Sequence, residues 1–217
     1  MPDLAQRHPL NPLIKPEDVL SHHPKMKVEC VLNPGVFQFE GKTWLVLRVA
    51  ELPLQEEGKI TIPLMKDNSI EVISFDLDDP LLNTSDPREP RYDGETYLST
   101  ISHLRLFNSV DGAHFKDASW PSLLGKGDLE SYGVEDCRVA GMEDGSYLLT
   151  YTATSPSGYG VGLRRTCDWK KFEEFGMILP PANKDCAIFE KTIDGKYFCF
   201  HRPSGVGLGG HYVWLAS

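Results

Sequence analysis

The stretch SYGVEDCRVA, residues 131–140, places two carboxylates and a guanidinium within four positions of what otherwise reads as a short buried strand. The charged residues are Glu135, Asp136 and Arg138. Burying a charge costs free energy unless the charge is paired or hydrogen-bonded, and neighbouring residues of a strand point to opposite faces. Two interpretations follow. Either an ion pair with the arginine closes off a loop, or one carboxylate is a catalytic acid.

Polar residues suited to binding a sugar recur along the rest of the chain. They are Asn33, Arg48, Ser102, His103, Arg105, Asn183, Lys184, Asp185, His201 and Arg202. A sugar site needs amides and carboxylates for the hydroxyl groups, together with an aromatic wall. The candidates for that wall are Tyr132, Tyr151 and Trp120. Structural interpretations stay open as well: Arg48 as the ion-pair partner of an acid, His201 as a hydrogen-bonded core histidine, and Lys184 as part of a surface turn.

Short β-strands are the elements expected to hold these residues. Runs such as KTWLVLRV (42–49) and SYLLTYTA (146–153) are rich in β-branched and aromatic residues. Gly, Pro, Asn and Asp separate such runs, and the pattern predicts an all-β chain. Helical periodicity is scarce, so the helix candidates are short, at PEDV (16–19) and DWKKFEEF (168–175).

A repeat of about fifty residues runs through the chain. Four phrases place an acid–Gly pair before an aromatic-bearing strand, and their glycines are Gly41, Gly94, Gly145 and Gly195, at spacings of 53, 51 and 50 residues. A second phrase, L-x-x-[ST]-x-D followed by an aromatic residue, occurs in 106–115 and 163–172, and 213–217 begin a third copy. Repeats of this length with four short strands each are typical of a β-propeller. A β-sandwich with coincidental hairpins is the alternative.

The repeat count predicts an incomplete ring. About four blade repeats fit in the 217 residues, and the last is cut short. We therefore expect a single β-propeller domain over residues 1–217 that stops before its last blade. The innermost strands of a propeller line a central channel. The polar residues above are accordingly expected to meet at one mouth of that channel.

Composition limits the partners that the chain can have. The net charge of −9 and the lack of a basic run argue against nucleic acid. No window approaches the roughly 20 apolar residues of a membrane span, and the N-terminus has no apolar signal segment, so we expect no membrane association and a cytoplasmic location. The five cysteines are odd in number and include no C-x-x-C pair. Such spacing favours reduced thiols over disulfides or zinc, and no metal site is expected.

The order of three motifs, GVED-x-R, NKD-x-A-x-F and HRP, resembles glycoside hydrolase family 130. The resemblance extends from Asn11 to Ser217. It implies a five-bladed β-propeller, here incomplete, and an enzyme that acts on β-mannosides as a phosphorylase or a β-mannosidase. The implied partners are a mannose-containing oligosaccharide and inorganic phosphate as co-substrate. No other cofactor is implied, and homo-oligomers are common in the family.

The resemblance also implies roles for individual residues. Asp136 matches the catalytic aspartate, a general acid that delivers a proton to the leaving oxygen through a sugar hydroxyl. Asn33 and Arg48 match residues that hold the mannosyl unit. The phosphate-binding residues are expected to be Arg138, Lys184, His201 and Arg202. Further substrate contacts are expected from His103, Glu135, Tyr151 and Asp185, with Glu135 alternatively paired with an arginine.

The cations favour phosphorolysis over hydrolysis. Inverting cleavage needs an acid on the leaving group and a nucleophile on the opposite face of the ring. A hydrolase activates water with a second carboxylate, whereas a phosphorylase uses phosphate and needs a basic pocket. Two departures from the family pattern are Cys137, where proline is usual, and Cys186, where a smaller residue is usual. Hydrolysis, sugar binding without turnover, and an interaction propeller without a sugar site are the alternatives.

Overall fold

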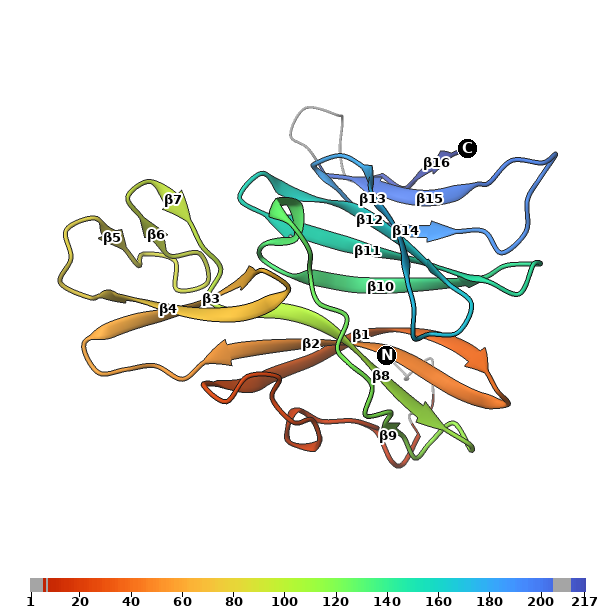
Figure 1. Cartoon of the computed structure of the whole chain (residues 1–217), viewed down its shortest axis with the longest axis horizontal. Helices are drawn as coiled ribbons and strands as arrows, with labels where there is room; N and C mark the ends of the chain where they lie inside the picture. The colour runs from red at the N-terminus through yellow and green to blue at the C-terminus, as the bar shows by residue number, and fades with distance from the viewer. Residues whose placement is uncertain (1–5, 7, 205–211) are drawn as a thin grey trace.

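The structure is a computed structural model that describes residues 6, 8–204 and 212–217. Within this part of the chain, three antiparallel sheets follow one another as blades, with two short 3-10 helices and no α-helix (Figure 1). Blade 1 has the strand order β1-β2-β8-β9, blade 2 has β10-β11-β12-β13, and blade 3 has β14-β15-β16. The sheets form an open arc, so the predicted all-β, incomplete propeller is confirmed.

The strand bounds follow the turn residues of the sequence. Blade 1 comprises β1 (Met26–Phe39), β2 (Lys42–Pro53), β8 (Ile101–Ser109) and β9 (Lys116–Asp117). Blade 2 comprises β10 (Val134–Gly141), β11 (Tyr147–Ser155), β12 (Gly158–Thr166) and β13 (Glu173–Leu179). Blade 3 comprises β14 (Asn183–Ile188), β15 (Cys199–Pro203) and β16 (Trp214–Ala216). The 3-10 helices are η1 (Pro16–Asp18), where a short helix is predicted, and η2 (Asp128–Glu130).

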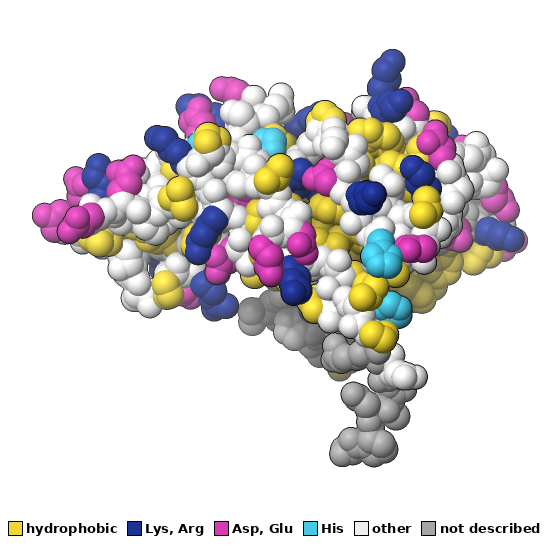
Figure 2. Space-filling view, turned by 90° about the horizontal axis from the view of Figure 1, so that it is seen from below, with side chains coloured by type: hydrophobic (Ala, Val, Ile, Leu, Met, Phe, Trp, Pro, Cys, Tyr) yellow, Lys and Arg dark blue, Asp and Glu magenta, His cyan; other side chains and the backbone are white. Residues whose placement is uncertain are grey.

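An arm interrupts blade 1 between β2 and β8. Its strands are β3 (Lys59–Lys66), β4 (Ser69–Asp76), β5 (Leu82–Asn83), β6 (Arg91–Tyr92) and β7 (Glu95–Thr96). They form a separate hairpin and a small three-stranded sheet that project to the left in Figure 1. Acidic side chains gather at the tip of this arm (Figure 2). Exposed acids there include Asp76, Asp78, Glu89, Asp93 and Glu95.

The predicted count of about four blade repeats is too high, because one of the four repeated phrases belongs to the arm. Gly41, Gly145 and Gly195, all with positive φ, lie between the first and second strands of blades 1, 2 and 3. Gly94 instead forms the β6–β7 turn of the arm. The arm is about as long as one repeat, so its turn falls in step with the blades by coincidence. The described residues therefore hold three blades.

The second repeated phrase marks the same turn in two blades. In blade 1 the Asp111 carboxylate accepts backbone hydrogen bonds from Ala113 and His114, at 2.9 and 2.8 Å. In blade 2 Asp168 accepts the equivalent bonds from residues 170 and 171, both at 2.9 Å. Such side-chain bonds stabilise turns in competition with helix. The helix predicted over 168–175 is therefore wrong, because this segment is a turn followed by β13.

The main core lies between blades 1 and 2. Alternate residues of β1, β2 and β8 face alternate residues of β10 and β11, as the two-residue period of a strand requires. The buried members of this core are Phe37, Trp44, Val46, Leu104, Leu106, Val134, Cys137, Leu149, Tyr151, Ala153 and Trp169. Phe37 stacks on Trp169 with ring centroids 3.7 Å apart. This packing fixes the two innermost strands, β1 and β10, side by side.

None of the helical segments that the structure describes has the length and apolar character needed to traverse a membrane. All five cysteines are free thiols, and Cys137 and Cys186 are buried.

Candidate active site

Each innermost strand carries one polar residue in a left-handed conformation at a register shift. These residues are Asn33, Asp136 and Asp185, with φ of 30°, 46° and 56°. The shifts fall between Leu32 and Gly35 in β1, Glu135 and Arg138 in β10, and Lys184 and Ala187 in β14. Asn and Asp tolerate positive φ better than other non-glycine residues, and bulges redirect side chains next to active sites. The three blades thus present equivalent polar side chains.

Asp136 is held by two side chains from the neighbouring blade. Asn33 Nδ2 and Arg48 Nη1 donate to its Oδ1 at 3.0 and 2.8 Å. Its side chain keeps 17% of its exposure, so it is confined but open to solvent. Both of these bonds use the same oxygen, and no hydrogen bond to Oδ2 is found among the described residues. The structure therefore brings together three of the residues predicted for the site.

Arg48 joins two acids and a hydroxyl. Its Nη2 lies 2.8 Å from Glu135 Oε1 and its Nε donates to Ser102 Oγ at 3.0 Å. Together with the Asp136 contact, each of the three guanidinium nitrogens has one partner, and two of these contacts are to carboxylates, which form strong charge-assisted hydrogen bonds with arginine. Glu135 is therefore paired with an arginine, the alternative left open by the sequence.

The two neighbouring carboxylates have pKa values shifted in opposite directions. Burial raises the pKa of Glu135 above its ordinary value, and the Arg48 charge offsets only part of that effect. Burial would also raise the pKa of Asp136, but hydrogen bonds from Arg48 and Asn33 outweigh it and lower the value. Paired acids with separated pKa values are typical of catalytic sites. Asp136 is the more readily ionised of the two.

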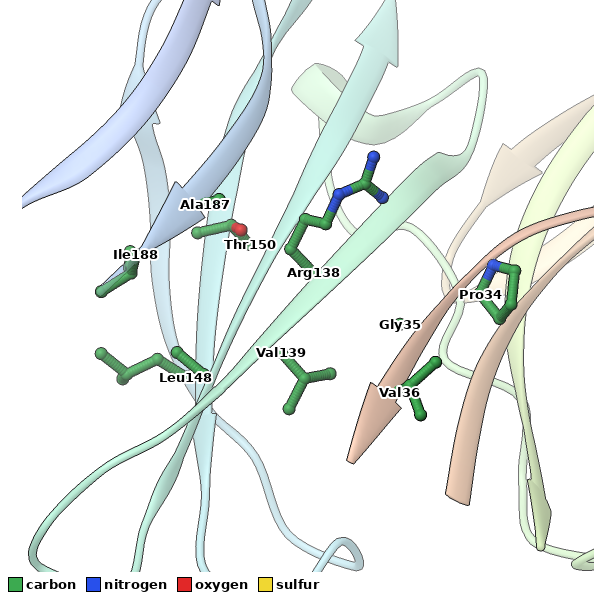
Figure 3. A pocket seen from close by; sticks show the side chains of 10 residues that line it. Pro34, Gly35, Val36, Arg138, Val139, Leu148, Thr150, Ala187 and Ile188 are labelled. Carbon is green, nitrogen blue, oxygen red and sulfur yellow. The ribbon is translucent and has the colours of Figure 1, made fainter. Parts of the chain in front are cut away.

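A cavity of about 220 Å³ lies between the three innermost strands. Figure 3 shows Arg138 in it, between Pro34 on one side and Thr150 and Ala187 on the other. Arg138 Nη1 donates to the carbonyls of residues 136 and 137 at 3.4 and 3.3 Å. These are weak contacts to neutral groups, and no salt bridge of Arg138 is found within the described ranges. Its positive charge acts on Asp136 and lowers the pKa of that carboxyl.

Blade 3 contributes the other predicted polar residues. Arg202 is paired with Asp185, whose Oδ2 lies 2.8 Å from Nε and 2.6 Å from Nη2. His201 Nδ1 lies 3.1 Å from Asn183 Oδ1. Lys184 Nζ lies over the ring of Tyr159, 5.3 Å from its centroid. Among the described residues Lys184 has no salt bridge, and its charge offsets a small part of the rise in the pKa of Glu135 that burial causes.

Two predicted substrate-binding residues lie away from this site. His103 is fully buried, with Nε2 3.0 Å from Glu51 Oε1. Tyr151 is 4% exposed and its hydroxyl donates to Glu130 at 2.6 Å. The cause is strand alternation: Ser102 faces Arg48, so its neighbour on β8 faces the opposite side of blade 1. Both predictions are therefore wrong.

The predicted aromatic wall is also absent from the described site. Tyr132 is buried and its hydroxyl donates to the Thr96 carbonyl. Trp120 packs against Trp44, with ring centroids 4.9 Å apart. Sequence reasoning misses Tyr159, the aromatic residue that does lie beside a predicted site residue. Nothing in the local sequence points to Tyr159, because the residue that it contacts, Lys184, belongs to the next blade.

No group of three or more His, Cys, Asp or Glu side chains in the described part of the chain is placed to hold a metal ion.

Comparison with known proteins gives consistent matches. The profile of glycoside hydrolase family 130, described as β-1,4-mannooligosaccharide phosphorylase, matches residues 91–216. A β-1,2-mannobiose phosphorylase from Listeria innocua is 36% identical over 218 residues, covering 97% of this chain and 61% of that protein. A β-1,2-mannobiose phosphorylase from Thermoanaerobacter is 33% identical over 132 residues, covering 56% of this chain and 39% of that protein.

A solved structure is similar over the same range. The complex of the Listeria innocua β-1,2-mannobiose phosphorylase with β-1,2-mannobiose superposes with a TM-score of 0.86 at 35% identity. The match covers 97% of this chain and 62% of that one. The chain thus spans about three fifths of the length of this relative.

Proposed function

The chain belongs to glycoside hydrolase family 130, and we propose that it cleaves β-mannosides by phosphorolysis with inversion, releasing α-mannose 1-phosphate. One observation carries the proposal. Asp136 is a carboxylate held by two side chains of the neighbouring blade, and the charge of Arg138 acts on it. Arg138 lines the cavity between the innermost strands and has no acidic partner among the described residues. Phosphate is already nucleophilic, so the protein must supply a proton donor and an anion pocket.

Asp136 is the proposed proton donor. Its hydrogen bonds to Asn33 and Arg48 fix the carboxyl and leave one oxygen free to pass a proton to a sugar hydroxyl or the leaving oxygen. A general acid must be protonated, yet these bonds lower the pKa of Asp136. Bound phosphate brings negative charge and the sugar removes water, and both effects raise the pKa of a nearby carboxyl. Asp136 is therefore protonated when both the sugar and phosphate are bound.

The phosphate is proposed to bind Arg138 and Lys184. Neither has an acidic partner in the described residues, whereas the other two arginines of the site are ion-paired. Arg202 is the strand partner of Lys184 and follows His201 on β15, with Arg202 fixed by Asp185. An unpaired cation retains its donors for a phosphate oxygen. Asp185 and Glu135 are proposed to contact the sugar through the arginines that they hold.

Hydrolysis is the second candidate, since it would use the same acid. It requires another carboxylate free to activate water, about 6.5–9.5 Å from the acid. Glu135 is held by Arg48 and Asp185 by Arg202. Both carboxylates are ion-paired, as Asp136 is, so the support for phosphorolysis over hydrolysis comes from Arg138 and Lys184, which have no acidic partner among the described residues.

We propose a β-1,2-linked mannoside as substrate, because the relative that covers 97% of the chain is a β-1,2-mannobiose phosphorylase. The test is incubation with β-1,2- and β-1,4-mannobiose, with and without inorganic phosphate. Phosphate-dependent α-mannose 1-phosphate from the β-1,2 substrate is expected. Mannose formed equally well without phosphate would reject phosphorolysis, and preference for the β-1,4 substrate would reject the linkage.

A further inference from the structure

We propose that Tyr159, in the β11–β12 hairpin of blade 2, is a positioning residue for the Lys184 ammonium group. This inference rests on the proposed function, because it assigns that ammonium group to inorganic phosphate. Neither the motifs nor the family resemblance points to the tyrosine. The assignment comes from two contacts that its side chain makes across the boundary between blades 2 and 3.

The two contacts join blade 2 to both strands of the first hairpin in blade 3. Lys184, near the start of β14, places Nζ 5.3 Å from the Tyr159 ring centroid. Ser204, directly after β15, has its Oγ 2.7 Å from the Tyr159 hydroxyl. Tyr159 itself is fixed by its pairing with Thr154 in blade 2. A single half-buried side chain thus ties the lysine to the blade that carries Asp136.

The ring holds the lysine without neutralising it. A cation within about 6 Å of an aromatic face is attracted by the ring quadrupole. Within the described chain no salt bridge competes for Lys184, in contrast to Arg202, which is engaged by Asp185. The ammonium group has three donors and can turn them to phosphate while its side chain stays on the ring. The tyrosine thereby sets the distance between the anion pocket and the proton donor.

Three variants separate the ring from the hydroxyl. Tyr159→Leu removes both contacts, Tyr159→Phe keeps the ring, and Ser204→Ala is the matched control that removes only the hydroxyl contact. Binding of inorganic phosphate is measured by calorimetry on each folded variant, and KM for phosphate and for mannobiose is measured alongside. We expect the leucine variant to lose about threefold to tenfold in phosphate affinity, the range that a cation–π contact supports. The other two variants should stay within about twofold, and KM for mannobiose should not move.

Three results would overturn the inference. They are unchanged phosphate affinity in the leucine variant, an equal loss of phosphate and mannobiose affinity, or no phosphate binding by the unaltered protein. The two proposals fail separately. Weakened phosphate binding without any mannose 1-phosphate formation rejects the proposed function but keeps the positioning role. If the unaltered protein forms mannose 1-phosphate but the leucine variant binds phosphate equally well, the proposed function is kept and the positioning role is rejected.

Discussion

The interface between blades 1 and 2 and the far face of blade 3 use the same residue types in different surroundings. In the interface, Phe37 is 7% exposed and stacked on Trp169. On blade 3, Cys199 and Ala216 line a cavity against blade 2, so Phe200 and its strand partner Leu215 face the other way. Phe200 and Leu215 are 46% and 57% exposed. Both β1–β2 and β15–β16 have the alternating apolar pattern of a covered sheet, but among the described residues another sheet covers only β1–β2.

The site residues divide in the same way. Asp136 is held across the covered interface by side chains of blade 1, whereas Asp185, at the equivalent bulge, has among the described residues a side-chain partner in its own blade alone, Arg202. The comparison shows that packing between blades, more than pairing within a sheet, fixes the position of the proposed acid. The predictions below test that difference.

The largest expected difference lies between the two equivalent aspartates. Asp136→Asn should lower phosphorolysis of β-1,2-mannobiose by about 10²- to 10⁴-fold, the usual contribution of a general acid. Asp185→Asn, the matched variant, should lower it by no more than about tenfold, since it only loosens Arg202. Initial rates with both variants at saturating phosphate measure this. Equal losses would mean that the two bulges are functionally equivalent.

Two phenylalanines test the packing half of the comparison. Phe37→Ala removes a stacked, buried ring and should lower the free energy of unfolding by about 3–5 kcal/mol. Phe200→Ala removes a half-exposed ring and should cost less than about 1 kcal/mol. Urea unfolding curves for the two variants provide the values. If the variants were equally destabilised, the exposed face of blade 3 would contribute as much as the core.

Two glycines test how tightly the interface is built. Gly133 has φ of +102°, and a Cβ there would lie 2.4 Å from the Ser102 carbonyl oxygen. Gly133→Ala should therefore cost about 2–4 kcal/mol, through strain and a backbone clash. Gly94 also has a positive φ but has open space around it. Gly94→Ala should therefore lower the free energy of unfolding by only about 1 kcal/mol. Thermal unfolding distinguishes the two, and a similar cost at both positions would contradict close contact between blades 1 and 2.

The smallest effect concerns acid titration of the paired carboxylates. The lowered pKa of Asp136 gives stability that is present above its unfolded pKa and is lost as the pH falls through the folded value. The raised pKa of Glu135 gives stability at low pH that is lost as the pH rises through the folded value. Asp136→Asn should flatten the acid decline, and Glu135→Gln should flatten the decline with rising pH. Unfolding free energies from about pH 3 to 6 test both signs.

The sequence predicts the blades well where a local signal defines the turn. The acid–Gly pairs at Gly41 and Gly145 and the carboxylate turns at Asp111 and Asp168 lie where the repeat places them. The phrase at Gly94 misleads because a local turn signal is the same in an arm as in a blade. Only strand pairing distinguishes the two, and pairing between β2 and β8 spans the whole arm.

The sequence predicts those site residues that lie in a recognisable motif or polar pattern. Motif order identifies Asp136, and the polar pattern adds Asn33 and Arg48, which the structure brings together. His103 fails because a one-residue step on a strand reverses the face. Tyr159 is missed because its contacts come from another blade, and such contacts leave no mark in local sequence.

The central claim, that Asp136 donates the proton, is tested most directly by leaving-group dependence. Asp136→Asn is assayed with β-1,2-mannobiose and with a dinitrophenyl β-mannoside, whose leaving group needs no proton. The account predicts a loss of about 10²-fold or more with the disaccharide and a loss of less than about tenfold with the activated mannoside. Equal losses with both substrates would show that Asp136 binds or orients the sugar and that another group donates the proton.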